Sequence, residues 1–144
     1  MSHSTRFDRS SIRFAPVVKV PILLIDDDPS VRRSLGRLLH AHGYDVLDAG
    51  NVGQALEILA TTLPALMLMD MVMPGEDSLN AARKFKAEPR TAAVPIIALT
   101  ALPPSAPQDQ ALFAEVVAKP SNARALLDTI AKVLGTAQAG SSAG

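Results

Sequence analysis

Four places in this sequence, each at the end of a short apolar run, carry side chains suited to phosphate chemistry. Asp26 and Asp27 follow the first run, Asp70 ends the second, and Thr100 and Lys119 end two later ones. Together they would supply carboxylates for a metal ion, one carboxylate nucleophile, one hydroxyl and one ammonium group. Phosphoryl transfer requires such a set, because cations and hydrogen-bond donors offset the charge of the transferring group while a carboxylate attacks it.

The apolar runs predict the elements that would bring these side chains together. Residues 22–25 and 65–69 are unbroken and apolar, which is typical of strands buried on both faces of a parallel sheet. In open parallel sheets, ligands bind outside the carboxyl ends of the strands. If the two strands are neighbours, their carboxylates converge and repel each other, and a hard divalent metal with oxygen ligands would stabilise the cluster.

Strand and helix patterns alternate five times, which predicts an α/β protein with a parallel sheet and right-handed crossovers. The expected strands are residues 19–25, 44–49, 65–70, 95–100 and 115–118. Residues that can cap a helix through a side-chain oxygen precede four of the expected helices. These residues are Asp28, Asn51, Asp77 and either Ser121 or Asn122.

The stretch of residues 101–114 predicts less regular structure. Pro103, Pro104 and Pro107 exclude a long helix there, because proline lacks a backbone N–H and clashes with the preceding turn. We expect at most a short fourth helix, from residue 105 or 107 to 113.

The composition narrows the class of protein. The chain has 144 residues, 48% of them hydrophobic and 3% aromatic, which suits one domain with an aliphatic core. Its 14 basic and 14 acidic residues balance, so no overall field favours nucleic acid or a membrane surface. No run approaches the roughly 18 apolar residues of a membrane span. The absence of cysteine excludes disulfides, thiolate metal sites and thiol catalysis.

The two ends of the sequence differ from the stretch between them. Residues 1–18 carry three arginines against one aspartate, and we expect a flexible arm there. They lack the apolar core of a secretory signal, so we expect a cytoplasmic protein, with a transit peptide as the less favoured alternative. Residues 19–135 would form the single domain, and the small polar residues 136–144 are expected to be a disordered tail.

Four stretches of the sequence resemble the receiver domain of two-component response regulators, in particular chemotaxis-type receivers. The stretches are ILLIDDDPSVRRSL, ALMLMDMVMPGEDSL, PIIALTA and VVAKP. The resemblance covers residues 19–135 and implies a flavodoxin-like fold, in which a doubly wound five-stranded parallel sheet has the order 2-1-3-4-5. The short fourth helix would be atypical of that fold.

The resemblance also implies how the acidic residues divide the work. Asp70 matches the phosphoacceptor, which forms an aspartyl phosphate. Asp27 matches the main acidic ligand of Mg²⁺, and Asp26 matches its acidic neighbour. Asp70 itself and the backbone carbonyl of Val72 would complete the set of protein ligands.

Four further residues match positions near the phosphoryl group. Thr100 matches the switch hydroxyl that follows this group, and Lys119 matches the lysine that pairs with one of its oxygens. Ala101 matches a small residue that leaves a path to the acyl phosphate. Pro120 matches a proline preceded by a cis peptide bond.

By this resemblance, the chain is expected to be a single-domain response regulator and a phosphoacceptor switch more than a turnover enzyme. The donor would be a sensor histidine kinase or a histidine phosphotransfer protein. The domain would catalyse its own Mg²⁺-dependent phosphorylation and slow dephosphorylation. Output would pass through contact with another protein, for which residues 101–114 are the first choice of surface, with no direct role for nucleic acid or membrane. The sequence does not decide between a monomer and a homodimer.

Three departures from the family pattern bear on the output. Val116 stands where receivers usually have an aromatic residue, so the common aromatic swing coupled to the threonine cannot occur in its usual form. The stretch between Thr100 and Lys119 is about three residues shorter than in many receivers. Ser78 replaces a frequent glycine.

Two other functions remain open from the sequence. A binding module that keeps the fold but works without phosphorylation would be consistent with Val116 and the proline-rich stretch. An aspartate-nucleophile phosphatase is less favoured. Such enzymes carry a second acid two residues after the nucleophile, and Val72 stands at that position after Asp70. Asp26 and Asp28 have that spacing, but Pro29 and Ser30 follow them in place of the matching context.

Each residue also has a simpler structural explanation. The first acids could be a solvated helix entry, Thr100 a turn hydroxyl, and Lys119 an exposed strand-end lysine. Only their joint occurrence favours a phosphoryl site. Arg32 and Arg33 could lie on a solvated face or on a surface that docks a kinase.

Overall fold

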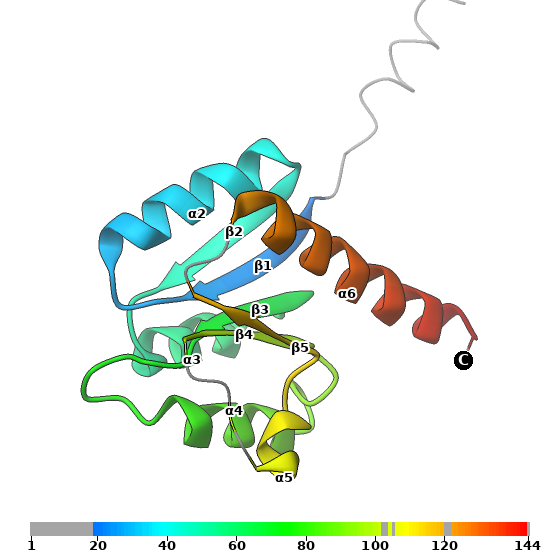
Figure 1. Cartoon of the computed structure of the whole chain (residues 1–144). Helices are drawn as coiled ribbons and strands as arrows, with labels where there is room; N and C mark the ends of the chain where they lie inside the picture. The colour runs from blue at the N-terminus through cyan, green and yellow to red at the C-terminus, as the bar shows by residue number, and fades with distance from the viewer. Residues whose placement is uncertain (1–18, 102–103, 105, 120–121, 144) are drawn as a thin grey trace, which may run out of the picture.

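The computed structural model describes residues 19–101, 104, 106–119 and 122–143. Five parallel strands form one sheet in the order β2-β1-β3-β4-β5 (Figure 1). The alternating sequence pattern predicted the parallel sheet, and the family resemblance implied this order. The strands are β1 (Val20–Ile25), β2 (Tyr44–Ala49), β3 (Leu66–Asp70), β4 (Ile96–Thr100) and β5 (Glu115–Ala118). The helices are α2 (Pro29–Ala41), α3 (Val52–Thr61), α4 (Ser78–Ala87), α5 (Pro107–Gln110) and α6 (Ala123–Ala143).

Both faces of the sheet are covered, so the central strands are buried throughout (Figure 1). On one face, Met67 and Met69 pack with Phe85 of α4 and with side chains of α3. On the other face, Leu24 and Leu68 pack with side chains of α2 and α6. The even alternation of β3 between these two clusters explains why its sequence is an unbroken apolar run.

The expected helix starts are present in the structure. The carboxylate of Asp28 accepts the backbone N–H of Ser30 at 2.9 Å, and that of Asp77 accepts the N–H of Asn80 at 3.0 Å. The side-chain oxygen of Asn51 likewise accepts the N–H of Gln54 at 2.8 Å. These bonds satisfy N–H groups that have no partner within the helix, which fixes the turn before each helix.

The helix α5, the fourth in the described part of the chain, is short, as the prolines predicted. It makes a single turn over Pro107–Gln110, and a turn follows it, so its end falls before the limit of residue 113. Phe113 is buried against the α3–α4 face of the sheet. Burying this ring fixes where the chain must leave the short helix to enter β5.

The helix α6 continues to Ala143, into the stretch for which a disordered tail was expected. Alanine has the highest helix propensity, and adding a residue to an existing helix avoids the cost of nucleation. The expectations for an arm over residues 1–18 and for a cis bond before Pro120 concern positions outside the described residues.

Within the described part of the chain, no helix combines the length and the apolar character that crossing a membrane demands.

Candidate functional site

The strand register brings the predicted site residues to one edge of the sheet. Ile25 of β1 lies opposite Met69 of β3, so Asp26, which follows β1, and Asp70, which ends β3, lie at the same edge. Thr100 ends β4 beside Ala118 of β5, and Lys119 comes directly after it. The backbone N–H of Lys119 continues this pairing by donating to the carbonyl of Thr100 at 3.2 Å.

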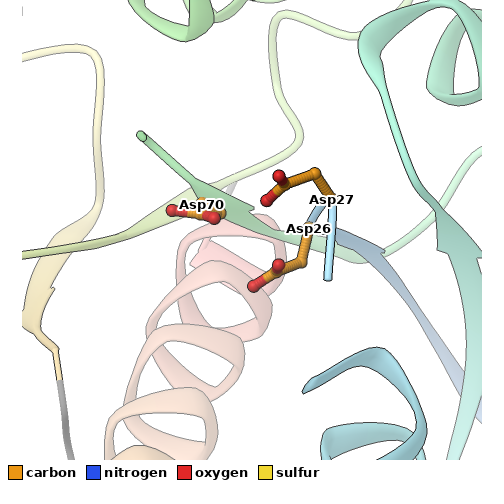
Figure 2. Close-up of side chains that lie close together, drawn as sticks. All are labelled: Asp26, Asp27 and Asp70. Atoms are coloured by element: carbon orange, nitrogen blue, oxygen red, sulfur yellow. The ribbon is translucent and has the colours of Figure 1, made fainter. Parts of the chain in front are cut away.

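Three carboxylates gather at this edge. Asp26, Asp27 and Asp70 each place one carboxylate oxygen within 4.8 Å of the others (Figure 2). Asp26 and Asp70 are only 1% and 4% exposed, whereas Asp27 is exposed to solvent. The cluster is therefore closed toward the core and open toward one side, where Asp27 lies.

The position of Asp26 follows from the strand before it and from two hydrogen bonds. The strand β1 delivers Asp26 directly from a buried apolar run, and the backbone N–H of Asp26 donates to the carbonyl of Ala49 on β2 at 3.1 Å. Its carboxylate accepts the N–H of Asp28 at 2.9 Å. This turn orients the side chain of Asp26 before α2 begins.

Lys119 provides the cation of the site. Its Nζ lies 3.4 Å from Asp26 Oδ2 and 3.4 Å from Asp70 Oδ1, and its side chain is 34% exposed. One ammonium group is therefore shared by two buried carboxylates that belong to different strands.

The surroundings of Asp70 shift the pKa of its carboxyl clearly. Burial raises the pKa of the Asp70 carboxyl above its ordinary value, because desolvation disfavours the charged form. The N–H of Val72, which donates to Asp70 Oδ1 at 3.0 Å, and the charge of Lys119 both act to lower this pKa. The nearby carboxylate of Asp26 raises it further.

Asp28 differs from the three clustered acids. It is exposed, and hydrogen bonds from the first turn of α2, mainly from Ser30, lower the pKa of its carboxyl. This supports the interpretation of Asp28 as a helix cap rather than as a member of the acid cluster.

The acid cluster fits a hard divalent cation such as Mg²⁺. Three carboxylates converge on one volume, while Lys119 contributes a single positive charge to it. All three carboxylates offer oxygen atoms as ligands, and oxygen is the ligand atom that Mg²⁺ prefers. Asp26, Asp27 and Asp70 are the residues that could hold it.

Two other predicted residues lie nearby. Thr100 is 1% exposed at the end of β4, the strand adjacent to the one that ends at Asp70. Val72 follows Asp70 in the next loop, and its side chain is among the exposed large apolar ones. The roles expected of the Thr100 hydroxyl and of the Val72 carbonyl stay predictions.

The sequence left Arg32 open between a solvated face and a surface that docks a kinase, and assigned it no contact within the site. Arg32 of α2 donates from Nη1 to the backbone carbonyl of Asp26 at 2.6 Å and from Nε to the carboxylate of Asp48 at 3.0 Å. Its place in the first turn after the Asp28 cap indicated that it lay near the acids. The partner on β2 was not visible in the local sequence.

Comparisons with known proteins agree with this geometry. The family model of the response regulator receiver domain matches residues 22–131. The chain therefore belongs to the response regulator receiver domain family, whose members act in two-component signalling as phosphoacceptor switches.

Sequence relatives carry names consistent with this family. Protein PilH of Pseudomonas aeruginosa is 37% identical over 79 residues, which are 55% of this chain and 65% of PilH. Response regulator PleD of Caulobacter vibrioides is 38% identical over 81 residues, which are 56% of this chain but 18% of PleD. The match thus spans less than two thirds of either relative.

Solved structures show the same fold. A response regulator receiver protein from Pseudomonas putida has a TM-score of 0.73 at 26% identity, with 81% of this chain and 99% of that chain covered. The receiver domain of a sensor histidine kinase from Pseudomonas aeruginosa has a TM-score of 0.71 at 27% identity, with 82% and 99% covered. That structure has a magnesium ion coordinated in its active-site cleft.

Proposed function

We propose that this domain accepts a phosphoryl group on Asp70, with Mg²⁺, from a phosphohistidine of a sensor kinase or phosphotransfer protein. The observation that carries the proposal is the position of Asp70. It is buried, lies 3.4 Å from Lys119 Nζ, and shares one volume with the carboxylates of Asp26 and Asp27.

In the proposed transfer, a carboxylate oxygen of Asp70 attacks the phosphorus atom of the donor. A P–O bond forms as the P–N bond breaks, and the imidazole nitrogen leaves with the electron pair and takes up a proton. The aspartyl phosphate later reacts with water, which releases inorganic phosphate and restores the carboxylate. The raised pKa of Asp70 matters here, because only the ionised carboxyl can attack.

Lys119 and Thr100 would act on the transferred group. The ammonium of Lys119 already lies against the acceptor carboxylate, so it can offset the charge of phosphoryl oxygens without a large movement. Thr100 ends the adjacent strand, where a hydroxyl could donate to another of those oxygens.

Asp26, Asp27 and Asp70 are the side chains that would hold Mg²⁺, and the backbone carbonyl of Val72 is the further ligand that the family resemblance implies. The ion would supply positive charge that offsets the acids and the phosphoryl oxygens. The chain's own contribution is to hold these acids together before any ligand arrives.

The output is proposed to be a change in protein–protein contact. Addition of a dianionic group at Asp70 would bias the loop after β3 and the segment after Thr100 between two arrangements. The segment around α5 is the first candidate for the contact, and a homodimer is one form that the contact could take. A cytoplasmic location belongs to the same proposal, since histidine kinases take their phosphoryl group from ATP.

A receiver-fold module that works without phosphorylation is the second candidate. Val116 favours it, because this half-buried aliphatic residue cannot reproduce the aromatic swing of other receivers. The acid cluster with its lysine argues against it, because a binding module has no need of three converging carboxylates, two of them buried, beside a cation.

Beryllofluoride, which mimics an acyl phosphate, separates the two candidates. The chain has no tryptophan, so backbone amide NMR spectra are the suitable readout. We expect shifts around residues 70–73 and 100–101 only when beryllofluoride and Mg²⁺ are both present. Asp70→Asn should abolish these shifts, whereas the exposed-acid control Asp45→Asn should keep them. Shifts that persist in Asp70→Asn, or their absence in the wild-type chain, would contradict phosphoacceptance at Asp70.

A further inference from the structure

Arg32 connects the acid cluster to a strand that contributes no acid to it. Its side chain is 19% exposed, whereas its neighbour Arg33 is exposed. The guanidinium group donates to the Asp26 carbonyl at 2.6 Å and to Asp48 Oδ2 at 3.0 Å. The fixed fork of an arginine can reach both acceptors at once, which a lysine ammonium does less well.

The carbonyl that Arg32 contacts belongs to the peptide unit joining Asp26 to Asp27. A peptide unit is planar, so holding its oxygen restrains the orientation of the plane that joins the Cα atoms of Asp26 and Asp27. The other bonds around Asp26 hold its N–H, through Ala49, and its carboxylate, through the N–H of Asp28. Arg32 holds the remaining polar group of this residue.

Gly50 provides an independent indication that this place is built for the arginine. A Cβ atom added to Gly50 would lie 3.0 Å from Arg32 Nη1, 3.3 Å from Gln54 Oε1 and 3.4 Å from Arg32 Cζ. The contact with Nη1 is the tightest of the three, so a side chain at Gly50 would require the guanidinium group to shift by a few tenths of an ångström. The end of β2 thus supplies both an acceptor, Asp48, and the space that the arginine occupies.

We propose that Arg32 is a positioning residue that orients the Asp26–Asp27 turn for binding of Mg²⁺. The proposal rests on the function proposed above. Arg32 touches neither the ion nor the phosphoryl group in this role, and Asp48 offsets its charge. Arg32 would therefore act by orienting the metal ligands rather than through its positive charge. Residues that hold metal ligands in place act in the same way in other proteins.

Titration of the apo protein with Mg²⁺, followed by amide NMR, tests this role. Arg32→Gln should weaken Mg²⁺ binding by about 10-fold or more, the usual effect of removing a residue that orients a metal ligand. Arg32→Lys should restore only part of the loss. Arg33→Gln is the matched control, because it removes the same charge from the next residue, and its affinity should change by less than about 2-fold.

Gly50→Ala gives a second measurement that leaves Arg32 in place. It should weaken Mg²⁺ binding in the wild-type background but have little further effect in Arg32→Gln, because the two changes disturb the same contact. Equal weakening in both backgrounds would overturn the proposal. So would an Arg32→Gln variant that is less stable to urea but binds Mg²⁺ as the wild-type chain does.

The failure of this proposal can be distinguished from failure of the proposed function. If the wild-type chain binds no Mg²⁺, or if Asp27→Asn binds it equally well, the acid cluster is not the metal site. If the wild-type chain binds and Asp27→Asn does not, while Arg32→Gln matches Arg33→Gln, only the positioning role is lost.

Discussion

Lys119 Nζ lies 3.4 Å from Asp70 Oδ1, and it lies at the same distance from Asp26 Oδ2. The two carboxylates are almost fully buried and come from adjacent strands. The lysine therefore lowers the repulsion between two acids while it remains partly open to solvent. This shared contact makes Lys119 as much a structural residue of the unphosphorylated domain as a partner for phosphate.

The first prediction concerns this cation. Lys119→Met should lower the free energy of unfolding at pH 7, because it leaves two buried carboxylates without their neighbour. Breaking a fully buried ion pair costs about 3–5 kcal/mol and an exposed one about 0–1. Since Lys119 is 34% exposed, we expect about 1–2 kcal/mol.

Urea denaturation of Lys119→Met and of Lys132→Met measures this loss. Lys132 pairs with Glu115 at 3.1 Å, but its side chain is 69% exposed and that of Glu115 is 36% exposed, so the control should lose less than about 1 kcal/mol. Equal losses in the two variants would show that burial does not strengthen the Lys119 contact.

The raised pKa of Asp70 predicts how stability depends on pH. A carboxyl whose pKa is higher in the folded chain stabilises the fold fully below the unfolded value of 3.8. That contribution is lost as the pH rises through the folded pKa. In Mg²⁺-free buffer, Asp70→Asn should therefore gain stability relative to the wild-type chain as the pH rises from 3.8 through the folded pKa of Asp70.

Denaturation curves between pH 3 and pH 7 would check this sign, with Asp45→Asn as the control. Asp45 is exposed on β2, so its replacement should give a nearly constant offset. The idea would have to be abandoned if the difference between Asp70→Asn and the wild-type chain stayed flat or ran the other way.

Mg²⁺ should stabilise the chain through the acid cluster. A ligand at 100 times its dissociation constant adds about 2.7 kcal/mol when it binds only the folded state. Asp27 is exposed, so Asp27→Asn should unfold near the wild-type temperature in EDTA but gain little on addition of Mg²⁺. Calorimetric melting in EDTA and in Mg²⁺ compares the two gains, and a full gain in Asp27→Asn would falsify the assignment.

Ser78 offers a prediction of increased stability. Its Oγ is buried and has no hydrogen-bond partner in the part of the chain that the structure describes. An unsatisfied buried hydroxyl costs about 1–3 kcal/mol, so Ser78→Ala should stabilise the domain by about 1 kcal/mol. Ser34→Ala, on an exposed position of α2, should change stability by less than about 0.5 kcal/mol. A loss of stability in Ser78→Ala would indicate a polar contact.

Much of the site could be predicted because its residues end apolar strands. The apolar runs before Asp26 and Asp70 identify buried parallel strands. The carboxyl ends of neighbouring parallel strands lie at the same edge of a sheet. The caps at Asp28 and Asp77 are equally local, since each carboxylate bonds to a backbone N–H within three residues. Local patterns of this kind can be found without knowing the fold.

Other features depended on contacts between distant segments. Arg32 meets Asp48 only because α2 packs beside β2, and no local pattern reports that pairing. The length of α6, which continues to Ala143, was also not expected, because the small polar composition of the last residues is typical of disorder. The end of α5 follows from the burial of Phe113, which is likewise a tertiary effect.

The position of β5 has a consequence for hydrogen exchange. This strand has four residues, lies at the edge of the sheet and pairs only with β4 among the described strands. Short edge strands open more readily than the centre of a sheet, and each opening would carry Lys119 away from Asp26 and Asp70. A phosphoryl group that attracts the lysine would raise the free energy of that opening. Slower hydrogen exchange of the β5 amides would then indicate that Asp70 carries a phosphoryl group.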